Sequence, residues 1–244
     1  MSSSEQRATP APHSPGEGGN NGLSAVYSPS WFARRAAYRP VYRRFAQAVE
    51  ELWHPRSILD VGCGAGYLLE HFAGKAPICG VDGSQAALDA APSRVRPFCS
   101  LRDLAEEPFL PMKAARWAVA VSIEVAEHIP AEHVEAFLRW FDGADRVLLT
   151  AAPPGQGGNH HVNEQPQSYW IERFEARSLR YDPPDTQAWQ ALARRYTSAC
   201  PWVPRNAMVF VRAALPSASR NSPSDSAVGS DLEAEWLTAT AAPR

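Results

Sequence analysis

Acidic and histidine side chains gather at two places in this sequence where they could bind an ion or move a proton. Glu124, Glu127 and His128 lie close together after the apolar run WAVAVSI. His160 and His161 follow in a segment rich in glycine and proline. Carboxylate oxygens and imidazole nitrogens bind divalent metals, and an imidazole can also act as a general base because its pKa lies near neutrality. These side chains are therefore the candidates for catalysis or metal binding.

A glycine-rich turn, DVGCGAG at residues 60–66, follows one apolar run and precedes an amphipathic one. Glycines let a ligand approach the backbone, and the start of a following helix attracts a carboxylate. Asp82 ends the next apolar run, where its carboxylate could accept hydrogen bonds from both hydroxyls of a ribose. Asp103 could meet an adenine amino group and Leu104 the ring, although Asp103 fits a surface carboxylate equally well. Together these positions indicate a nucleoside site, whereas the turn alone could simply pack a helix on a strand.

The elements that position these residues alternate along the chain as short apolar runs and longer amphipathic stretches, which is typical of a parallel sheet with crossover helices. The pattern places strands at residues 57–61, 78–81, 95–98, 117–123, 146–150 and 207–212. It places helices at residues 67–72, 84–90, 131–141 and 169–177. The predicted fold class is α/β: a doubly wound, Rossmann-like, seven-stranded and mostly parallel sheet in a single domain.

Composition separates this domain from two tails. Residues 1–23 are rich in Ser, Pro, Gly and Asn, and residues 217–244 in Ser, Pro and Ala. Such segments cannot bury enough apolar surface to offset the entropy of ordering, so both are predicted to be disordered. Residues 24–216 are then one domain, which suits a chain of 244 residues with 45% hydrophobic content.

Charge and cysteine content narrow the setting of the protein. A formal net charge of -2 and a pI near 6.4 argue against a nucleic-acid-binding protein. The arginines at residues 34–44 are expected to form the solvated face of a helix beside a packed aromatic face. The four cysteines lack paired spacing, which predicts a reducing, cytoplasmic location. No signal peptide or membrane-spanning run is expected, and therefore no membrane insertion.

Four segments resemble the class I S-adenosylmethionine-dependent methyltransferases in order and spacing: ILDVGCGAGYLLEHF, CGVDGS, CSLRDL and VSIEVAEHIP. The fourth separates the chain from NAD-binding Rossmann proteins, whose G-x-G-x-x-G turn is also unmatched. The resemblance covers roughly residues 55–150. It implies that residues 60–66 hold the methionine part of S-adenosylmethionine, Asp82 the ribose, and Asp103 with Leu104 the adenine. The cofactor-binding candidates are Asp60, Gly62, Cys63, Gly64, Gly66, Asp82, Gly83, Asp103 and Leu104.

The E-x-x-E-H segment is similar to that of the ubiquinone-pathway O-methyltransferases and of small-RNA terminal 2'-O-methyltransferases, in which these residues bind a divalent metal. The resemblance implies an ion such as Mg²⁺ held by Glu124, Glu127, His128 and His161. Other members of the family carry a similar segment without a metal, so a metal-free route with a histidine base stays open. The catalytic candidates are His161, His128 and Glu124, and His161 could also be an exposed loop residue.

Two further segments, SAVYSPSWFARRAAYRPVYRRF and AAPPGQGGNHHVNEQPQSYWIERF, look like a bacterial methyltransferase group found beside sugar and natural-product genes. This likeness extends to about residues 24–212. It implies an acceptor pocket lined by Glu164, Gln165, Tyr169, Trp170 and Asn206, although Tyr169 and Trp170 could equally be core residues. We expect O-methylation of a hydroxyl on a small molecule or sugar. Two alternatives stay open: an RNA terminal 2'-O-methyltransferase, which the charge disfavours, and a cofactor-binding scaffold without turnover, which the intact glycine and acidic positions disfavour.

Overall fold

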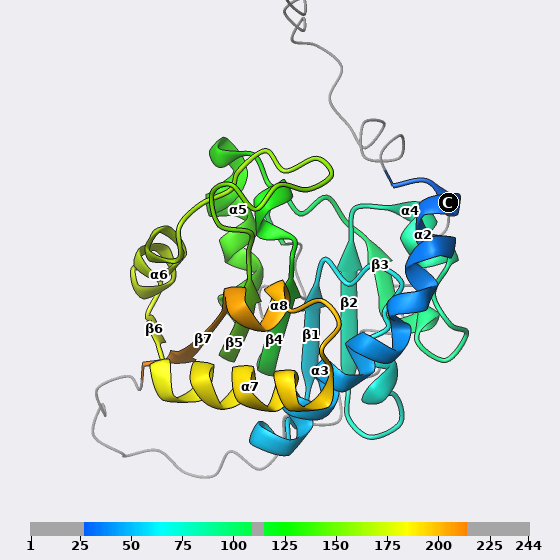
Figure 1. Cartoon of the computed structure of the whole chain (residues 1–244), viewed down its shortest axis with the longest axis horizontal. Coiled ribbons are helices and arrows are strands. Elements are labelled where there is room, and N and C mark those ends of the chain that lie inside the picture. The colour runs from blue at the N-terminus through cyan, green and yellow to red at the C-terminus, as the bar shows by residue number, and fades with distance from the viewer. Residues whose placement is uncertain (1–26, 109–114, 214–244) are drawn as a thin grey trace, which may run out of the picture.

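The computed structural model describes residues 27–108 and 115–213 (Figure 1). The predicted tails, residues 1–23 and 217–244, lie outside the described residues, as do both ends of the predicted domain. In the described part the strands form one seven-stranded sheet. They are β1 (Ile58–Val61), β2 (Ile78–Asp82), β3 (Cys99–Leu101), β4 (Trp117–Ile123), β5 (Ala144–Thr150), β6 (Leu179–Tyr181) and β7 (Ala207–Arg212).

The strand order is β3-β2-β1-β4-β5-β7-β6. β1 pairs in parallel with β2 and β4, so that Asp60 lies between Gly80 and Val121. Only β7 runs antiparallel to its neighbours, β5 and β6. The predicted doubly wound and mostly parallel sheet is confirmed, and the order reverses at β1, beside β4, where open sheets of this kind bind their ligands.

Helices cover both faces of the sheet (Figure 1). Ile58 of β1 packs in one core cluster with Phe45 of α3 (Arg39–Trp53) and Trp189 of α7 (Pro183–Tyr196). Leu59, next along the strand, packs in the opposite cluster with Phe137 of α5 (Val134–Leu138) and with Trp170 and Phe174 of α6 (Gln167–Glu175). This alternation is the two-residue period of a strand that is covered on both sides.

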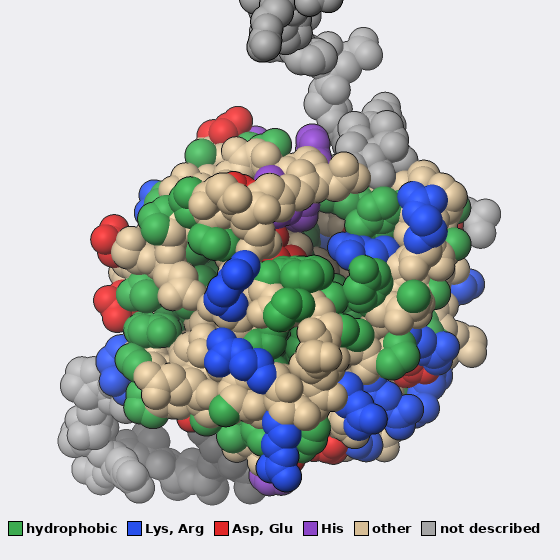
Figure 2. All heavy atoms as spheres, in the orientation of Figure 1, with side chains coloured by type: hydrophobic (Ala, Val, Ile, Leu, Met, Phe, Trp, Pro, Cys, Tyr) green, Lys and Arg blue, Asp and Glu red, His purple; other side chains and the backbone are tan. Residues whose placement is uncertain are grey.

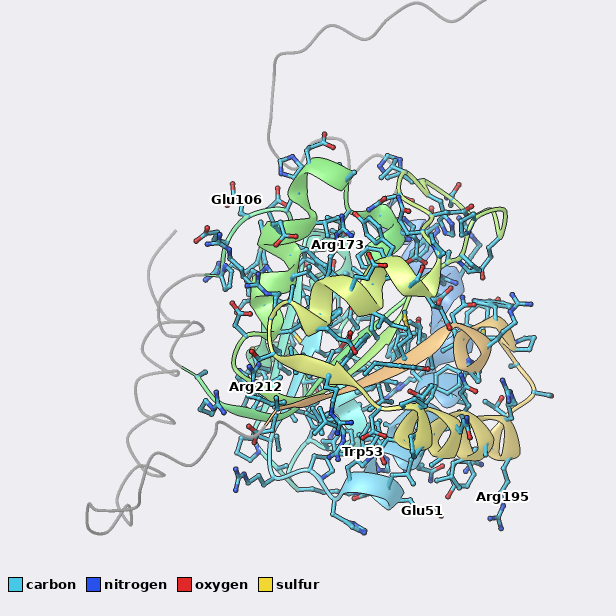
Figure 3. All side chains as sticks on the ribbon, turned by 90° about the vertical axis from the view of Figure 1, so that its left-hand side faces the viewer. Glu51, Trp53, Glu106, Arg173, Arg195 and Arg212 are labelled. Atoms are coloured by element: carbon cyan, nitrogen blue, oxygen red, sulfur yellow. The ribbon has the colours of Figure 1, made fainter. Side chains whose placement is uncertain are left out.

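The antiparallel strand β7, which lies between β5 and β6, is tied to the chain at the start of β5 by a charged side chain. Figure 3 views the molecule from the side and labels Arg212, the last residue of β7. Its guanidinium donates hydrogen bonds to the carbonyl oxygens of Ala144 and Phe141, at 2.8 and 3.2 Å. These bonds fix the antiparallel end of the sheet against β5.

The remaining helices are short. α2 (Pro29–Arg35) begins where Ser28 accepts a hydrogen bond from the backbone N–H of Trp31, with Pro29 at the first helical position. The others are η1 (Ala36–Tyr38), η2 (Leu69–His71), α4 (Gln85–Asp89), η3 (Arg96–Phe98), η4 (Ala126–His128), η5 (Ala131–His133), η6 (Arg139–Phe141) and α8 (Trp202–Asn206). In the part of the chain that the structure describes, none of the helices is long and apolar enough to cross a membrane.

Two predicted elements are wrong. The strand predicted at residues 95–98 is the 3-10 helix η3, and β3 begins only at Cys99, since Pro97 has no N–H for a strand ladder. The helix predicted at residues 67–72 shrinks to the single 3-10 turn η2. Gly66 and Gly74, both with positive φ, bracket this segment. The glycine turn is therefore followed by turns rather than by a regular α-helix.

One other predicted helix is divided into shorter ones, and three elements of the structure were not predicted. The helix predicted at residues 131–141 is divided into η5, α5 and η6. β6, α7 and α8 were not predicted, although α7 carries a clear start signal. Asp182 caps it by accepting a hydrogen bond from the N–H of Asp185, and prolines occupy its first positions.

Candidate cofactor and acceptor site

A cavity of about 800 Å³ lies over the carboxyl ends of β1, β2 and β4. Figure 2 shows this face hollowed, with histidine side chains above the hollow and basic and hydrophobic side chains around it. Most of the predicted site residues line it: Asp60, Gly62, Cys63, Gly64, Asp82, Gly83, Leu104, Glu124, Glu127, His128 and His161. The structure thus brings the glycine turn and the acidic-histidine segments into one space.

The glycine turn is built for close contact. Gly62 has φ 80°, and a Cβ there would lie 2.4 Å from a methyl carbon of Val125. Gly64, at φ 53°, donates its N–H to the carboxylate of Asp82 at 2.7 Å, and Ser84 donates to the other oxygen at 2.8 Å. Asp82 therefore ties the turn to the end of β2. These residues converge as the sequence predicted.

Two acids, buried Asp60 and half-buried Asp82, share the turn end of the cavity. Burial raises the pKa of Asp60 to about 8, and the nearby charge of Asp82 acts in the same direction. Burial also raises the pKa of Asp82, although the N–H groups of Gly64 and Ser84 oppose it. A ligand that brings positive charge into this end of the cavity would relieve both acids. A sulfonium and an ammonium group meet that requirement.

Two predicted cofactor residues lie apart from the cavity wall as the described residues form it. Asp103 accepts a hydrogen bond from the N–H of Ala105 at 2.9 Å and so stabilises a local turn. Gly66 has φ 67°, and a Cβ there would lie 3.2 Å from Val95, so this glycine serves the packing of the turn. Leu104 is buried and does line the cavity.

Glu127, His128 and His161 form a cluster whose ligand atoms all lie within 4.8 Å of one another. Glu127 is fully buried, and neither of its carboxylate oxygens has a hydrogen-bond partner among the described residues. Burial, reinforced by the charge of Glu124, raises the pKa of Glu127 to about 8, which nearby backbone groups oppose only in part. Burial lowers the pKa of His128 to about 4, so its imidazole is neutral near pH 7.

Neighbouring oxygens fix how the two imidazoles face the cluster. The carboxylate of Glu164 accepts a hydrogen bond from Nδ1 of His161 at 2.7 Å, which leaves Nε2 with a free lone pair 3.9 Å from Glu127. The carbonyl oxygen of His160 lies 2.9 Å from Nδ1 of His128 and can only accept, so this nitrogen carries the proton. The Tyr27 hydroxyl lies 3.2 Å from the same atom.

Glu124, the fourth predicted metal ligand, does not join this cluster. Its backbone has φ 54°, in the left-handed region. Its carboxylate accepts hydrogen bonds from Thr150 at 2.8 Å, Gln156 at 3.0 Å and Asn206 at 3.2 Å. Glu124 therefore joins the end of β4 to the loop after β5 and to α8, and it organises the site without being a ligand in the cluster.

The predicted acceptor pocket differs from the wall that the structure forms. Trp170 is fully buried in the core, and Tyr169 packs against it as a partly buried residue. Neither these two nor Glu164, Gln165 or Asn206 line the cavity in the described structure. The prediction that these five residues line the pocket is therefore not matched by the described cavity. Trp170 and Tyr169 pack in the core, and Glu164, Gln165 and Asn206 form hydrogen bonds to His161, Asn163 and Glu124.

The actual outer wall comes from segments that sequence reasoning did not assign to the site. The arginine-rich helix was expected to present a solvated face, yet Arg34 and Arg35 line the cavity. The sequence feature that could have indicated this role is the regular interleaving of aromatic residues and arginines over residues 31–44. The wall includes Tyr27, Trp31, Phe32, Tyr38, Tyr42, Cys200, Trp202 and Arg205.

The doubly wound sheet and the acid-flanked glycine turn define a nucleoside-cofactor enzyme of the class I methyltransferase type. A family model described as a methyltransferase domain matches residues 32–195. The chain therefore belongs to this family of S-adenosylmethionine-dependent methyltransferases.

Individual relatives are more distant. A ubiquinone biosynthesis O-methyltransferase of Alkalilimnicola ehrlichii is 30% identical over 146 residues, which cover 57% of this chain and 55% of the relative. The chain thus spans about half the length of that curated relative. The structure of Streptomyces venezuelae DesVI has a TM-score of 0.55 at 17% identity, covering 78% of this chain and 98% of that one. Magnesium protoporphyrin IX methyltransferase of Synechocystis PCC 6803, with bound SAH, has a TM-score of 0.51 at 16% identity, covering 81% and 90%. These structures show the shared fold.

Proposed function

We propose that this chain transfers the methyl group of S-adenosylmethionine to a hydroxyl oxygen of a small molecule or sugar. The observation that carries the proposal is the oriented imidazole of His161 in the same cavity as the glycine turn, Asp60 and Asp82. The relative named as an O-methyltransferase supports the choice of oxygen. An oxygen acceptor needs a group that takes its proton, and the free Nε2 of His161 supplies one.

Methyl transfer is an in-line displacement, so the protein must mainly align the two reactants and remove one proton. S-adenosylmethionine supplies an electrophilic methyl group on its sulfonium. Asp82 and the turn hold the nucleoside end, and Asp60 stabilises the positive charge near the methionine end. His161 accepts the hydroxyl proton at Nε2, and Glu164 stabilises the resulting imidazolium through Nδ1.

A divalent ion at the cluster is a second candidate arrangement, favoured by the two unpartnered oxygens of buried Glu127. Glu127, His128 and His161 would hold the ion, which would lower the pKa of the acceptor hydroxyl. One carboxylate and two imidazoles suit Mn²⁺, Fe²⁺ or Zn²⁺ better than Mg²⁺, which prefers oxygen ligands. This donor set therefore does not favour the Mg²⁺ expected from the sequence.

Labelled S-adenosylmethionine and an extract of the native host, separated into small-molecule and RNA fractions, test the proposal. We expect the label in a methyl ether, identified by mass spectrometry. His161→Ala should lower turnover by about 10²–10⁴-fold, whereas His133→Ala, an exposed histidine away from the cavity, should leave turnover unchanged. A label on nitrogen, or equal turnover in His161→Ala, contradicts the proposal.

Chelation separates the two arrangements of the cluster. If His161 is the base, EDTA treatment leaves turnover unchanged. If an ion is bound, EDTA abolishes turnover, Mn²⁺ restores it, and calorimetry shows Mn²⁺ binding that Glu127→Gln removes.

The labelling experiment also separates the two alternative functions. RNA as the labelled product would favour the RNA-methylating alternative. Cofactor binding with no labelled product in any extract fraction would favour the scaffold alternative.

A further inference from the structure

Three arginines line the cavity without an acidic partner among the described residues. Arg34, Arg35 and Arg205 form no ion pair with any carboxylate in the part of the chain that the structure describes. Other arginines of the same helical layer and of the sheet do form ion pairs: Arg39 pairs with Glu70, and Arg146 pairs with Asp185 at 3.0 Å. Unmatched cations that border a cavity are available to a ligand.

Arg35 is held in place by aromatic rings instead of hydrogen bonds. Its guanidinium carbon lies 4.3 Å from the ring centroid of Trp31 and 5.4 Å from that of Tyr38. Stacking fixes the planar group while its N–H donors, which bond to no described residue, stay free. Planar carboxylate or phosphate oxygens are the partners that this fork of donors matches best.

Arg35 lies near enough to Tyr27 and His128 to affect the pKa of both side chains. Burial raises the pKa of Tyr27 to about 12, and the positive charge of Arg35 opposes that rise. Burial lowers the pKa of His128, and Arg35 adds to that effect. Arg35 is not among the charges that shift the pKa of Asp60 at the turn end.

Arg205 reaches the cavity from α8, on the side of the loop that carries His161. A guanidinium nitrogen lies 3.5 Å from the side-chain oxygen of Gln156, at the limit of a hydrogen bond. Gln156 is itself held by Glu124 and Asn206. Gln156 therefore helps to position the guanidinium of Arg205, but no carboxylate among the described residues forms an ion pair with it.

We propose that the acceptor carries an anionic group, a carboxylate or a phosphate, that Arg35 and Arg205 bind while its apolar body packs against the aromatic wall. This inference rests on the proposed function, since it describes the acceptor of the same cavity. The cofactor brings a single carboxylate of its own, whereas three arginines without an ion pair among the described residues line the cavity, so positive charge is left over for the acceptor. The remaining arginine charge selects an anionic acceptor over a neutral one.

Calorimetric titration of the protein saturated with S-adenosylhomocysteine (SAH), the demethylated cofactor, tests this proposal. The three probes are benzoate, phenyl phosphate and neutral benzamide. We expect at least one of the two anions to bind about tenfold more tightly than benzamide, or more tightly still. A stronger preference for benzoate identifies a carboxylate acceptor, and a stronger preference for phenyl phosphate identifies a phosphate acceptor. Arg35→Gln and Arg205→Gln should each remove most of the preference, whereas Arg43→Gln, an exposed arginine of α3 outside the cavity wall, should keep it.

The affinity for SAH, measured on the same proteins, separates failure of the proposed function from failure of the anionic-acceptor proposal. Failure of SAH to bind the wild-type protein overturns the proposed function itself. Normal SAH binding with benzamide as tight as the anions, or with no anion bound at millimolar concentration, overturns only the anionic acceptor. If Arg35→Gln and Arg205→Gln weaken SAH binding and leave the anion preference intact, the arginines serve the cofactor carboxylate and the inference is wrong.

Discussion

Cofactor binding should release a proton from Asp60. In the free protein burial raises the pKa of this carboxyl to about 8, so at pH 7 only about one-tenth of it is ionised. A cationic cofactor favours the ionised form and lowers the pKa, so about 0.9 proton should leave at pH 7. Since a proton leaves, the affinity should rise with pH by up to about tenfold per pH unit and level off above about pH 8.

Titration calorimetry in two buffers of different ionisation enthalpy gives the number of protons released. The cofactor amino group also titrates, so the informative quantity is the difference between the wild type and Asp60→Asn. Asp89→Asn, an exposed carboxyl on α4, should behave as the wild type. An equal proton number in the wild type and Asp60→Asn, or an affinity that is flat from pH 6 to 8, would refute the reasoning.

Three substitutions test other parts of the site. Gly62→Ala should weaken S-adenosylmethionine binding and lower the free energy of unfolding by about 1–3 kcal/mol, because its Cβ would lie 2.4 Å from a valine side chain. Gly74→Ala has the same φ of 80° and open space, so in denaturant titrations it should cost less and leave binding unchanged. Glu164→Gln should lower kcat by about 10–100-fold with little change in the KM for the cofactor, since it loosens the orientation of His161; an unchanged kcat would exclude the positioning role. Trp170→Ala should lower the free energy of unfolding by about 3–5 kcal/mol, as a core residue does; a loss of acceptor affinity at full stability would return it to the pocket.

The parts of the fold that could be predicted are those specified by local pattern. β1 and β4 are continuous apolar runs buried on both faces, and the sequence places them correctly. Pro97 moves the third strand, and the left-handed glycines on either side of residues 67–72 limit the helix there. Both effects depend on single backbone positions that an apolar run does not report.

The site follows the same division. Asp60 and Asp82 meet at the glycine turn because parallel strands end at a common edge, and this is predictable. Glu124 could not be separated from Glu127 by sequence, because the positive φ of Glu124 redirects its side chain. The place of Arg35 in the cavity wall depends on how α2 packs against α4, which no local pattern specifies.

The loop after β5 brings its own means of orienting His161. Glu164 holds the N–H groups of Gly155 and Gly157, each at 2.7 Å, and the same carboxylate holds the imidazole of His161. Residues 153–164 therefore carry the proposed base and the carboxylate that orients it within one short stretch of chain. A graft into another sheet of this type would still need a glutamate at the end of the central strand and the turn that follows it. Gln156 donates a hydrogen bond to the carboxylate of Glu124, and the N–H groups of Val162 and Asn163 donate to the carbonyl oxygen of Glu127.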